Sequence, residues 1–82
     1  MLKCYARRVG GKPNEIPNNQ WLIKDKEYTI IAICQSKTTG DMYYKLEEVQ
    51  PPAPYGGYNI DRFEVDWSSV LELVELDVIE VL

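Results

Sequence analysis

The segment from Tyr28 to Ser36 constrains the fold most, because it carries the strongest strand pattern in the chain. Five of its nine residues are β-branched or aromatic, and such side chains pack well on a pleated sheet. The run is almost continuously apolar, which predicts burial on both faces, as in a strand that curls through a small barrel. We therefore expect a mostly β protein built around this strand.

Other extended segments are predicted from alternation and from β-branched residues, at positions 2–9, 21–23, 42–48 and 76–82. Residues 60–65 are expected to begin with a short helical turn and to point Phe63 and Val65 inward. A capping-box pattern that starts at Ser69 allows one or two helical turns, yet residues 68–75 fit a strand equally well. The sequence leaves helix and strand open there.

Two long loops are predicted between these segments. Residues 10–20 contain two glycines, two prolines and three asparagines, and Ile16 within them is expected to plug one end of the core. Residues 50–59 contain three prolines, which lack the N–H of a ladder, and two glycines, which favour turns. We expect this second loop to cross the barrel.

The length of 82 residues allows one hydrophobic core, so residues 1–82 are predicted to form a single domain. No apolar run approaches the roughly 20 residues of a membrane span, and charged residues appear too early for a signal peptide. We therefore expect a cytoplasmic protein without membrane association, as a monomer or a weak homo-oligomer. Cys4 and Cys34 are expected to be buried free thiols.

Residues for catalysis are sparse. The chain has no histidine, which excludes Ser-His-Asp and Cys-His arrangements, and two cysteines alone cannot complete a zinc site. Gly10, Gly11 and Lys12 are followed by Pro13 rather than by a phosphate-binding helix. We expect no enzyme, no catalytic residue, no metal ligand and no cofactor.

Aromatic residues give the best functional lead. Tyr43, Tyr55, Tyr58 and Trp21 are predicted on loops or on strand faces that need not all point inward, with Tyr5 as a further candidate. Rigid rings of this kind line grooves that bind extended, proline-rich peptides. The competing interpretation is that Trp21 belongs to the core and that the loop tyrosines only pack the loop onto the barrel. The favoured function is binding of an unknown protein or peptide.

Charge is uneven along the chain and supplies two alternative functions. Residues 1–26 carry six basic and two acidic groups, and residues 27–82 carry three basic and eleven acidic ones. A basic edge could bind nucleic acid, although the net charge of −4 disfavours it. The carboxylates of the C-terminal tail could instead imitate DNA in an inhibitor. The basic residues in question are Lys3, Arg7, Arg8, Lys12, Lys24 and Lys26.

The order of short motifs resembles a known family. These motifs are Lys3-Cys4, Glu15-Ile16-Pro17, Trp21-Leu22-Ile23, residues 24–30, residues 45–48 and Asp61-Arg62-Phe63-Glu64. Together they are similar to small uncharacterised SH3-like barrel proteins of bacteriophages and gut bacteria, over residues 3 to 65. The resemblance implies an SH3-like barrel of about five strands with a short helical turn or helix near the C-terminus. It also implies a phage or mobile-element context and carries no activity; Asp25 stands where typical members have glycine.

Overall fold

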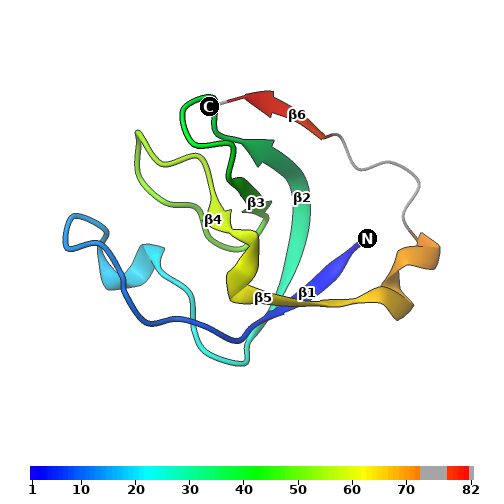
Figure 1. Cartoon of the computed structure of the whole chain (residues 1–82). Helices are drawn as coiled ribbons and strands as arrows, with labels where there is room; N and C mark the ends of the chain where they lie inside the picture. The colour runs from blue at the N-terminus through cyan, green and yellow to red at the C-terminus, as the bar shows by residue number, and fades with distance from the viewer. Residues whose placement is uncertain (73–77, 82) are drawn as a thin grey trace.

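The computed structural model describes residues 1–72 and 78–81, and the side chains of residues 1–69 (Figure 1). Six strands are present in this part of the chain, joined by three short 3₁₀ turns. The strands are β1 (Lys3–Ala6), β2 (Glu27–Gln35), β3 (Met42–Leu46), β4 (Tyr58–Asn59), β5 (Phe63–Asp66) and β6 (Val78–Val81). The 3₁₀ turns are η1 (Asn18–Gln20), η2 (Ile60–Arg62) and η3 (Trp67–Glu72).

The sheet has the strand order β4-β3-β2-β1-β5, and all of these neighbours are antiparallel. The long β2 curves visibly in Figure 1 and has two sets of partners. Its first residues pair with β1, and its residues from Ile30 to Gln35 pair with β3. β6 adds a parallel strand to β2 between Ile33 and Gln35. This arrangement confirms the prediction of a mostly β, barrel-like fold with about five strands and a short helical turn near the C-terminus.

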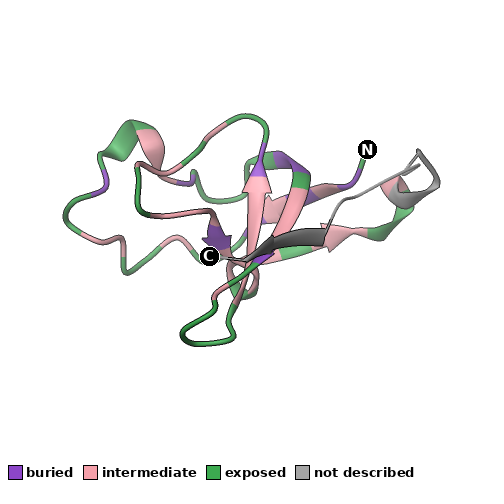
Figure 2. Cartoon of the chain, turned by 90° about the horizontal axis from the view of Figure 1, so that it is seen from above, coloured by how far each residue is buried: buried purple, intermediate pink, exposed green. Residues whose placement is uncertain are grey.

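The core lies between the curled strands, while exposed positions gather at the loop tips (Figure 2). Ile16 is also buried, although it lies outside the buried cluster, and its role as a plug of the core stays a prediction. Phe63 and Val65 pack against the core from β5, as expected. The buried cluster consists of Leu2, Cys4, Ala6, Leu22, Tyr28, Ile30, Leu46 and Tyr58.

Both cysteines are buried free thiols, as predicted. Burial, with smaller contributions from the nearby carboxylates of Glu48 and Glu27, raises the pKa of the Cys4 thiol to about 12. Thr29 is fully buried, and Glu48 accepts hydrogen bonds from its backbone N and its hydroxyl, each 2.7 Å long. The one buried polar residue among those described is therefore satisfied.

The structure corrects the expectation that the middle of β2 is buried on both faces. The register shifts between Ile30 and Ala32, which is a β-bulge, and the side chain between them turns outward. Ile31 is consequently 38% exposed, whereas Ile30 is 1% exposed.

Several segments also differ from the sequence expectation: β3 ends at Leu46, and β4 lies inside the segment predicted as the 50–59 loop. The first strand is limited to Lys3–Ala6, and residues 21–23 form no strand because they follow the η1 turn. Residues 67–72 form a 3₁₀ turn, which settles part of the open choice between helix and strand, and residues 73–75 lie outside the described part. β6 covers the middle of the predicted 76–82 strand. Of the carboxylates proposed as a DNA mimic, Glu64 and Asp66 lie on β5, where Glu64 pairs with Arg7, and those from Glu72 onward have side chains outside the described part.

Candidate functional site

Two long loops lie on the same side of the sheet and contact each other. They span residues 7–26 and 47–57, and Figures 1 and 2 show both extending away from the N-terminus. Gln20 Nε2 donates a hydrogen bond to the Gln50 carbonyl at 3.3 Å, and the Tyr55 hydroxyl donates one to the Glu15 carboxylate. These two contacts hold the loops together and define the cleft between them.

Trp21 is positioned by the end of the η1 turn. Its backbone N donates to the Asn18 carbonyl at 3.2 Å, which closes the turn, and its indole Nε1 donates to the Val9 carbonyl at 2.8 Å. The indole meets the Tyr58 ring edge to face, with centroids 5.7 Å apart and an interplanar angle of 68°. This is a favourable aromatic geometry that fixes the ring orientation.

Arg62 completes this arrangement from the η2 turn between β4 and β5. The Asn59 side chain caps the turn by accepting a hydrogen bond from Asp61 N at 2.9 Å. The guanidinium carbon of Arg62 then lies 4.8 Å from the centroid of the Trp21 ring. Its Nη1 donates to the carbonyls of Arg8, at 3.1 Å, and Gly10, at 2.7 Å. Arg62 thus ties the first loop to the η2 turn through a cation–π contact and two hydrogen bonds.

A cavity of about 240 Å³ opens at this junction. All four aromatic residues predicted as binding residues line it, although they come from a loop, two strands and a second loop. Trp21, Tyr43 and Tyr55 are partly exposed, whereas Tyr58 is 2% exposed and belongs to the core. We call this cavity the aromatic cleft; it is lined by Gly11, Pro13, Ile16, Trp21, Tyr43, Tyr55, Gly57, Tyr58, Asn59 and Arg62.

Gly57 sets the distance between β3 and the second loop. A Cβ atom at this position would lie 2.6 Å from the Tyr44 carbonyl oxygen and 3.3 Å from Tyr43 Cβ. Only glycine permits so close an approach of two backbones. The β3–β4 register pairs Tyr43 with Asn59 and Tyr44 with Tyr58, so Gly57 leads directly into the strand that closes the cleft.

The ionisation of the cleft residues follows from these contacts. The hydrogen bond to Glu15 raises the pKa of Tyr55, and the same bond lowers the pKa of Glu15. Burial raises the pKa of Tyr58 to about 12, and its hydroxyl donates to the Gln20 carbonyl at 2.6 Å. At neutral pH the phenols of Tyr55 and Tyr58 are therefore protonated, and Glu15, which accepts the hydrogen bond from Tyr55, is ionised.

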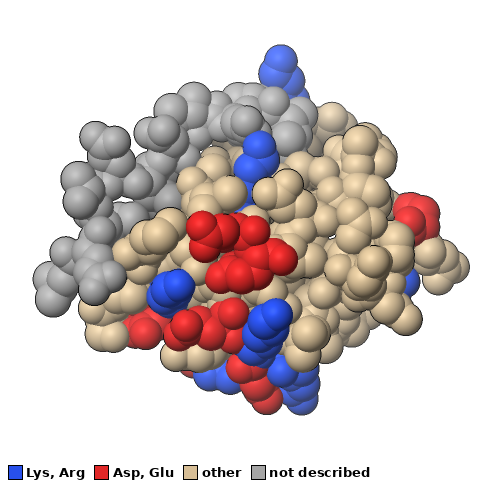
Figure 3. Space-filling model, turned by 180° about the vertical axis from the view of Figure 1, so that it is seen from behind, with Lys and Arg blue, Asp and Glu red and all other residues tan. Residues whose placement is uncertain are grey.

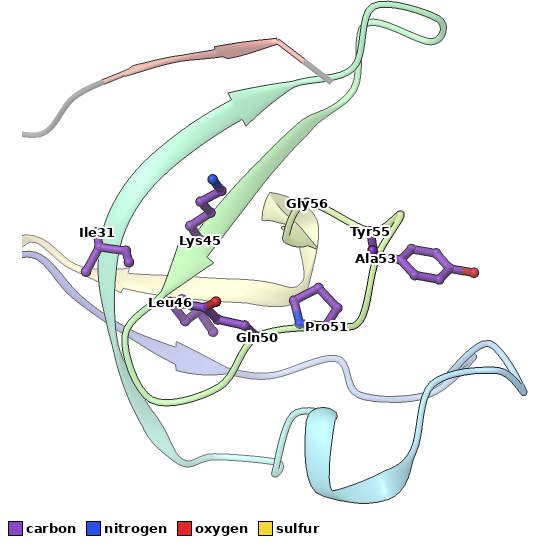
Figure 4. Close-up of a pocket in the computed structure, with 8 residues that line it drawn as sticks. All are labelled: Ile31, Lys45, Leu46, Gln50, Pro51, Ala53, Tyr55 and Gly56. Carbon is purple, nitrogen blue, oxygen red and sulfur yellow. The ribbon is translucent and has the colours of Figure 1, made fainter.

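A second cavity of about 400 Å³ lies on the other side of the 47–57 loop. Figure 4 shows Ile31 entering from β2, Lys45 from β3 and Pro51 from the loop, with the Tyr55 ring pointing away from the sheet. Tyr55 lines both cavities. Tyr55, which was predicted as a binding residue of the loop, therefore lies between the two cavities.

Arg62 was not among the residues predicted for binding, and the further candidate Tyr5 lies outside the aromatic cleft. Tyr5 lies on β1, where its hydroxyl donates to Glu27 at 3.2 Å, and it does not line the cleft. Arg62 belongs to the Asp61-Arg62-Phe63-Glu64 motif, but it lies 41 positions after Trp21 in the chain. No local pattern joins the two residues, because the fold alone brings η2 beneath the first loop.

Three of the six basic residues of positions 1–26, Lys3, Arg7 and Lys12, donate side-chain hydrogen bonds within the protein. Arg7 forms ion pairs with Asp25 and Glu64, both at 2.8 Å. Lys12 donates to the carbonyls of Pro13 and Ile16. On the face opposite to Figure 1, acidic side chains gather in the middle and Lys and Arg side chains lie around them (Figure 3).

Comparisons with known proteins give no guide to the function: no protein-family model, curated protein or solved structure matches this chain. Within the described residues, no three His, Cys, Asp or Glu side chains gather as a metal ion would require. No helix in the same part of the chain is long and apolar enough to cross a bilayer. The arrangement of the cleft is therefore the basis for a functional proposal.

Proposed function

We propose that this protein is a non-catalytic interaction module of the SH3-like barrel type that binds an extended, proline-containing peptide. The observation that carries the proposal is the convergence of Trp21, Tyr43 and Tyr55 on one cleft between two loops. Aromatic-lined grooves suit such peptides because a polyproline II segment is already ordered before it binds.

Preorganisation of the cleft supports the same proposal. The Trp21 indole is held by the Val9 carbonyl, by Tyr58 and by Arg62, so little side-chain freedom is lost when a ligand packs on it. The second loop is held to the first through Tyr55 and Glu15. A rigid aromatic surface of this kind contributes contact area at low entropic cost.

Nucleic acid is the partner that we set aside. Affinity for nucleic acid depends on cations that neutralise phosphates, and Arg7 and Lys12 already have partners within the protein. The net charge of −4 also disfavours binding of nucleic acid, because it repels the phosphates. The resemblance to bacteriophage and gut-bacterial proteins makes a host protein in the cytoplasm the partner that we propose.

The proposal is tested by tryptophan fluorescence. Trp67 is 67% exposed and is the second tryptophan of the chain, so Trp67→Phe leaves Trp21 as the reporter. Titration with a set of synthetic proline-rich peptides, and with matched peptides in which alanine replaces each proline, is expected to shift Trp21 emission with the proline peptides only. Proline-containing fragments of proteins captured from host lysate extend the set.

Two variants assign the binding to the cleft. Tyr43→Ala is expected to weaken peptide binding by about tenfold or more, as loss of a central aromatic contact does. Tyr5→Ala is the matched control, because Tyr5 is also a partly exposed strand tyrosine but lies outside the cleft. No binding by any proline peptide, or equal loss in both variants, would overturn the proposal.

A further inference from the structure

A third cavity extends the aromatic cleft at one end. It has a volume of about 310 Å³ and is lined by Arg8, Gly10, Asn59, Asp61 and Arg62. Asn59 and Arg62 line the aromatic cleft as well, so the two cavities adjoin. A peptide longer than a few residues that occupied the cleft would reach this end.

Within the described residues, no ion pair neutralises the two arginines at this end. Arg8 is exposed, and in the described part of the chain its side chain forms no ion pair. Arg62 donates from Nη1 to backbone carbonyls, which leaves Nη2 and Nε as donors. Asp61 is the one acidic residue among those lining the cavity, and no ion pair joins it to either arginine.

The neighbouring Arg7, by contrast, has both terminal nitrogens paired with carboxylates. Its two terminal nitrogens each contact a carboxylate at 2.8 Å, from Asp25 and from Glu64. The contrast between adjacent residues is informative, because Arg8 shares the exposure of Arg7 but pairs with no carboxylate among the residues that the structure describes. The open end of the cleft therefore carries two positive charges that a ligand can pair with.

We propose that the ligand of the aromatic cleft is an acidic proline-containing peptide, whose Asp or Glu side chain binds Arg8 and the remaining donors of Arg62. This inference rests on the proposed function and names its ligand class. Arginine suits the role because its fork of donors matches a carboxylate, and hydrogen bonds between charged groups are the stronger ones. The aromatic rings hold the extended segment, and the arginines set its direction and composition.

Charge complementarity selects a peptide rather than a nucleic acid as the occupant. A phosphate backbone presents a long row of negative charges and needs a matching row of cations. The cleft offers two arginines and Asp61 at one end, and the ionised Glu15 lies beside its lining residue Tyr55. A single acidic residue beside an extended segment fits this distribution, whereas a strand of phosphates would meet Glu15.

The test compares two peptides and two protein variants. Proline-rich peptides that bind in the fluorescence titration are synthesised with Glu or with Gln at each flanking position. Arg8→Glu removes the cation at the open end, while the backbone contacts of Arg8 with Arg62 remain available. Lys37→Glu is the matched control: it makes the same change in net charge on an exposed residue that lines none of the three cavities. Circular dichroism melting establishes that both variants fold.

The expected result is that the Glu peptide binds the parent protein about fivefold or more tightly than the Gln peptide. Arg8→Glu is expected to remove this preference and Lys37→Glu to keep it. Equal binding of both peptides would overturn the inference and leave the proposed function standing. Absence of binding by every proline peptide would overturn both. Displacement of the Glu peptide by an oligo(dT) strand with higher affinity would assign the arginines to nucleic acid and also overturn the inference.

Discussion

The central carbon of the Arg62 guanidinium lies 4.8 Å from the centroid of the Trp21 indole. The same guanidinium holds the carbonyls of Arg8 and Gly10, so one side chain orients the binding ring and anchors the loop beside it. The geometry of the aromatic cleft therefore depends on a residue that is itself part of the cleft.

Replacement of Arg62 is expected to loosen the first loop. Arg62→Ala removes two hydrogen bonds and the cation–π contact, so the free energy of unfolding is expected to fall by about 1–2 kcal/mol. Arg62→Lys retains the charge but not the fork of donors, and we expect an intermediate loss. Urea denaturation measures both, and faster amide exchange at Trp21 reports the loop. An unchanged stability in Arg62→Ala would show that these contacts do not hold the loop.

Two adjacent isoleucines of β2 are expected to differ strongly in their contribution to stability. Ile30→Ala creates a cavity at a position that is 1% exposed and is expected to cost about 2–5 kcal/mol. Ile31→Ala lies at the bulge, at 38% exposure, and is expected to cost about 1 kcal/mol or less. Thermal and urea unfolding of the two variants measures the loss of stability in each. Equal losses would contradict the outward turn of Ile31.

A pair of glycine replacements tests the close approach of the second loop to β3. Gly57→Ala places a Cβ against the Tyr44 carbonyl and is expected to lower stability by about 1–3 kcal/mol, because backbone must move. Gly10→Ala meets no atom within 4 Å and is expected to be nearly neutral. Peptide titration of Gly57→Ala should also show weaker binding, since the shift displaces Tyr43. Wild-type stability in Gly57→Ala would refute the tight contact.

The hydrogen bonds between Glu48 and Thr29 predict an acid-sensitive contribution to stability. Burial alone would raise the pKa of Glu48, but the two hydrogen bonds from Thr29 outweigh it and lower the pKa below the ordinary value of 4.5. A lowered pKa means that this contribution is complete above about pH 4.5 and is lost as the pH falls through the pKa of the folded state.

Urea unfolding between pH 7 and pH 2 measures that contribution. Glu48→Gln is expected to be less stable than the parent at pH 7, with the difference shrinking in acid. Glu47→Gln is the matched control, because Glu47 is the exposed neighbour and its side chain makes no hydrogen bond within the described residues. A pH-independent difference for Glu48→Gln would mean that its charge does not matter.

Local sequence patterns predicted most of the strands and both long loops of this protein. The β-branched run at 28–36 formed β2, and the prolines and glycines of the two long segments kept residues 10–20 and 50–57 out of the sheet, although Tyr58 and Asn59 form β4. Alternation along β3 placed Tyr44 and Leu46 toward the core. These features follow from the intrinsic preferences of each residue, which act over a few positions and can therefore be read from the sequence.

Only the tertiary structure decided how the aromatic residues divide between core and cleft. The four predicted rings line one cavity, but Tyr58 is buried and Tyr55 is partly exposed, although both lie within one Pro- and Gly-rich segment. The bulge that exposes Ile31 is likewise set by pairing with β3. The meeting of Trp21 with Arg62 depends on the strand order, which brings η2 to the first loop. Contacts between distant residues depend on how the whole sheet closes, and no local pattern specifies that closure.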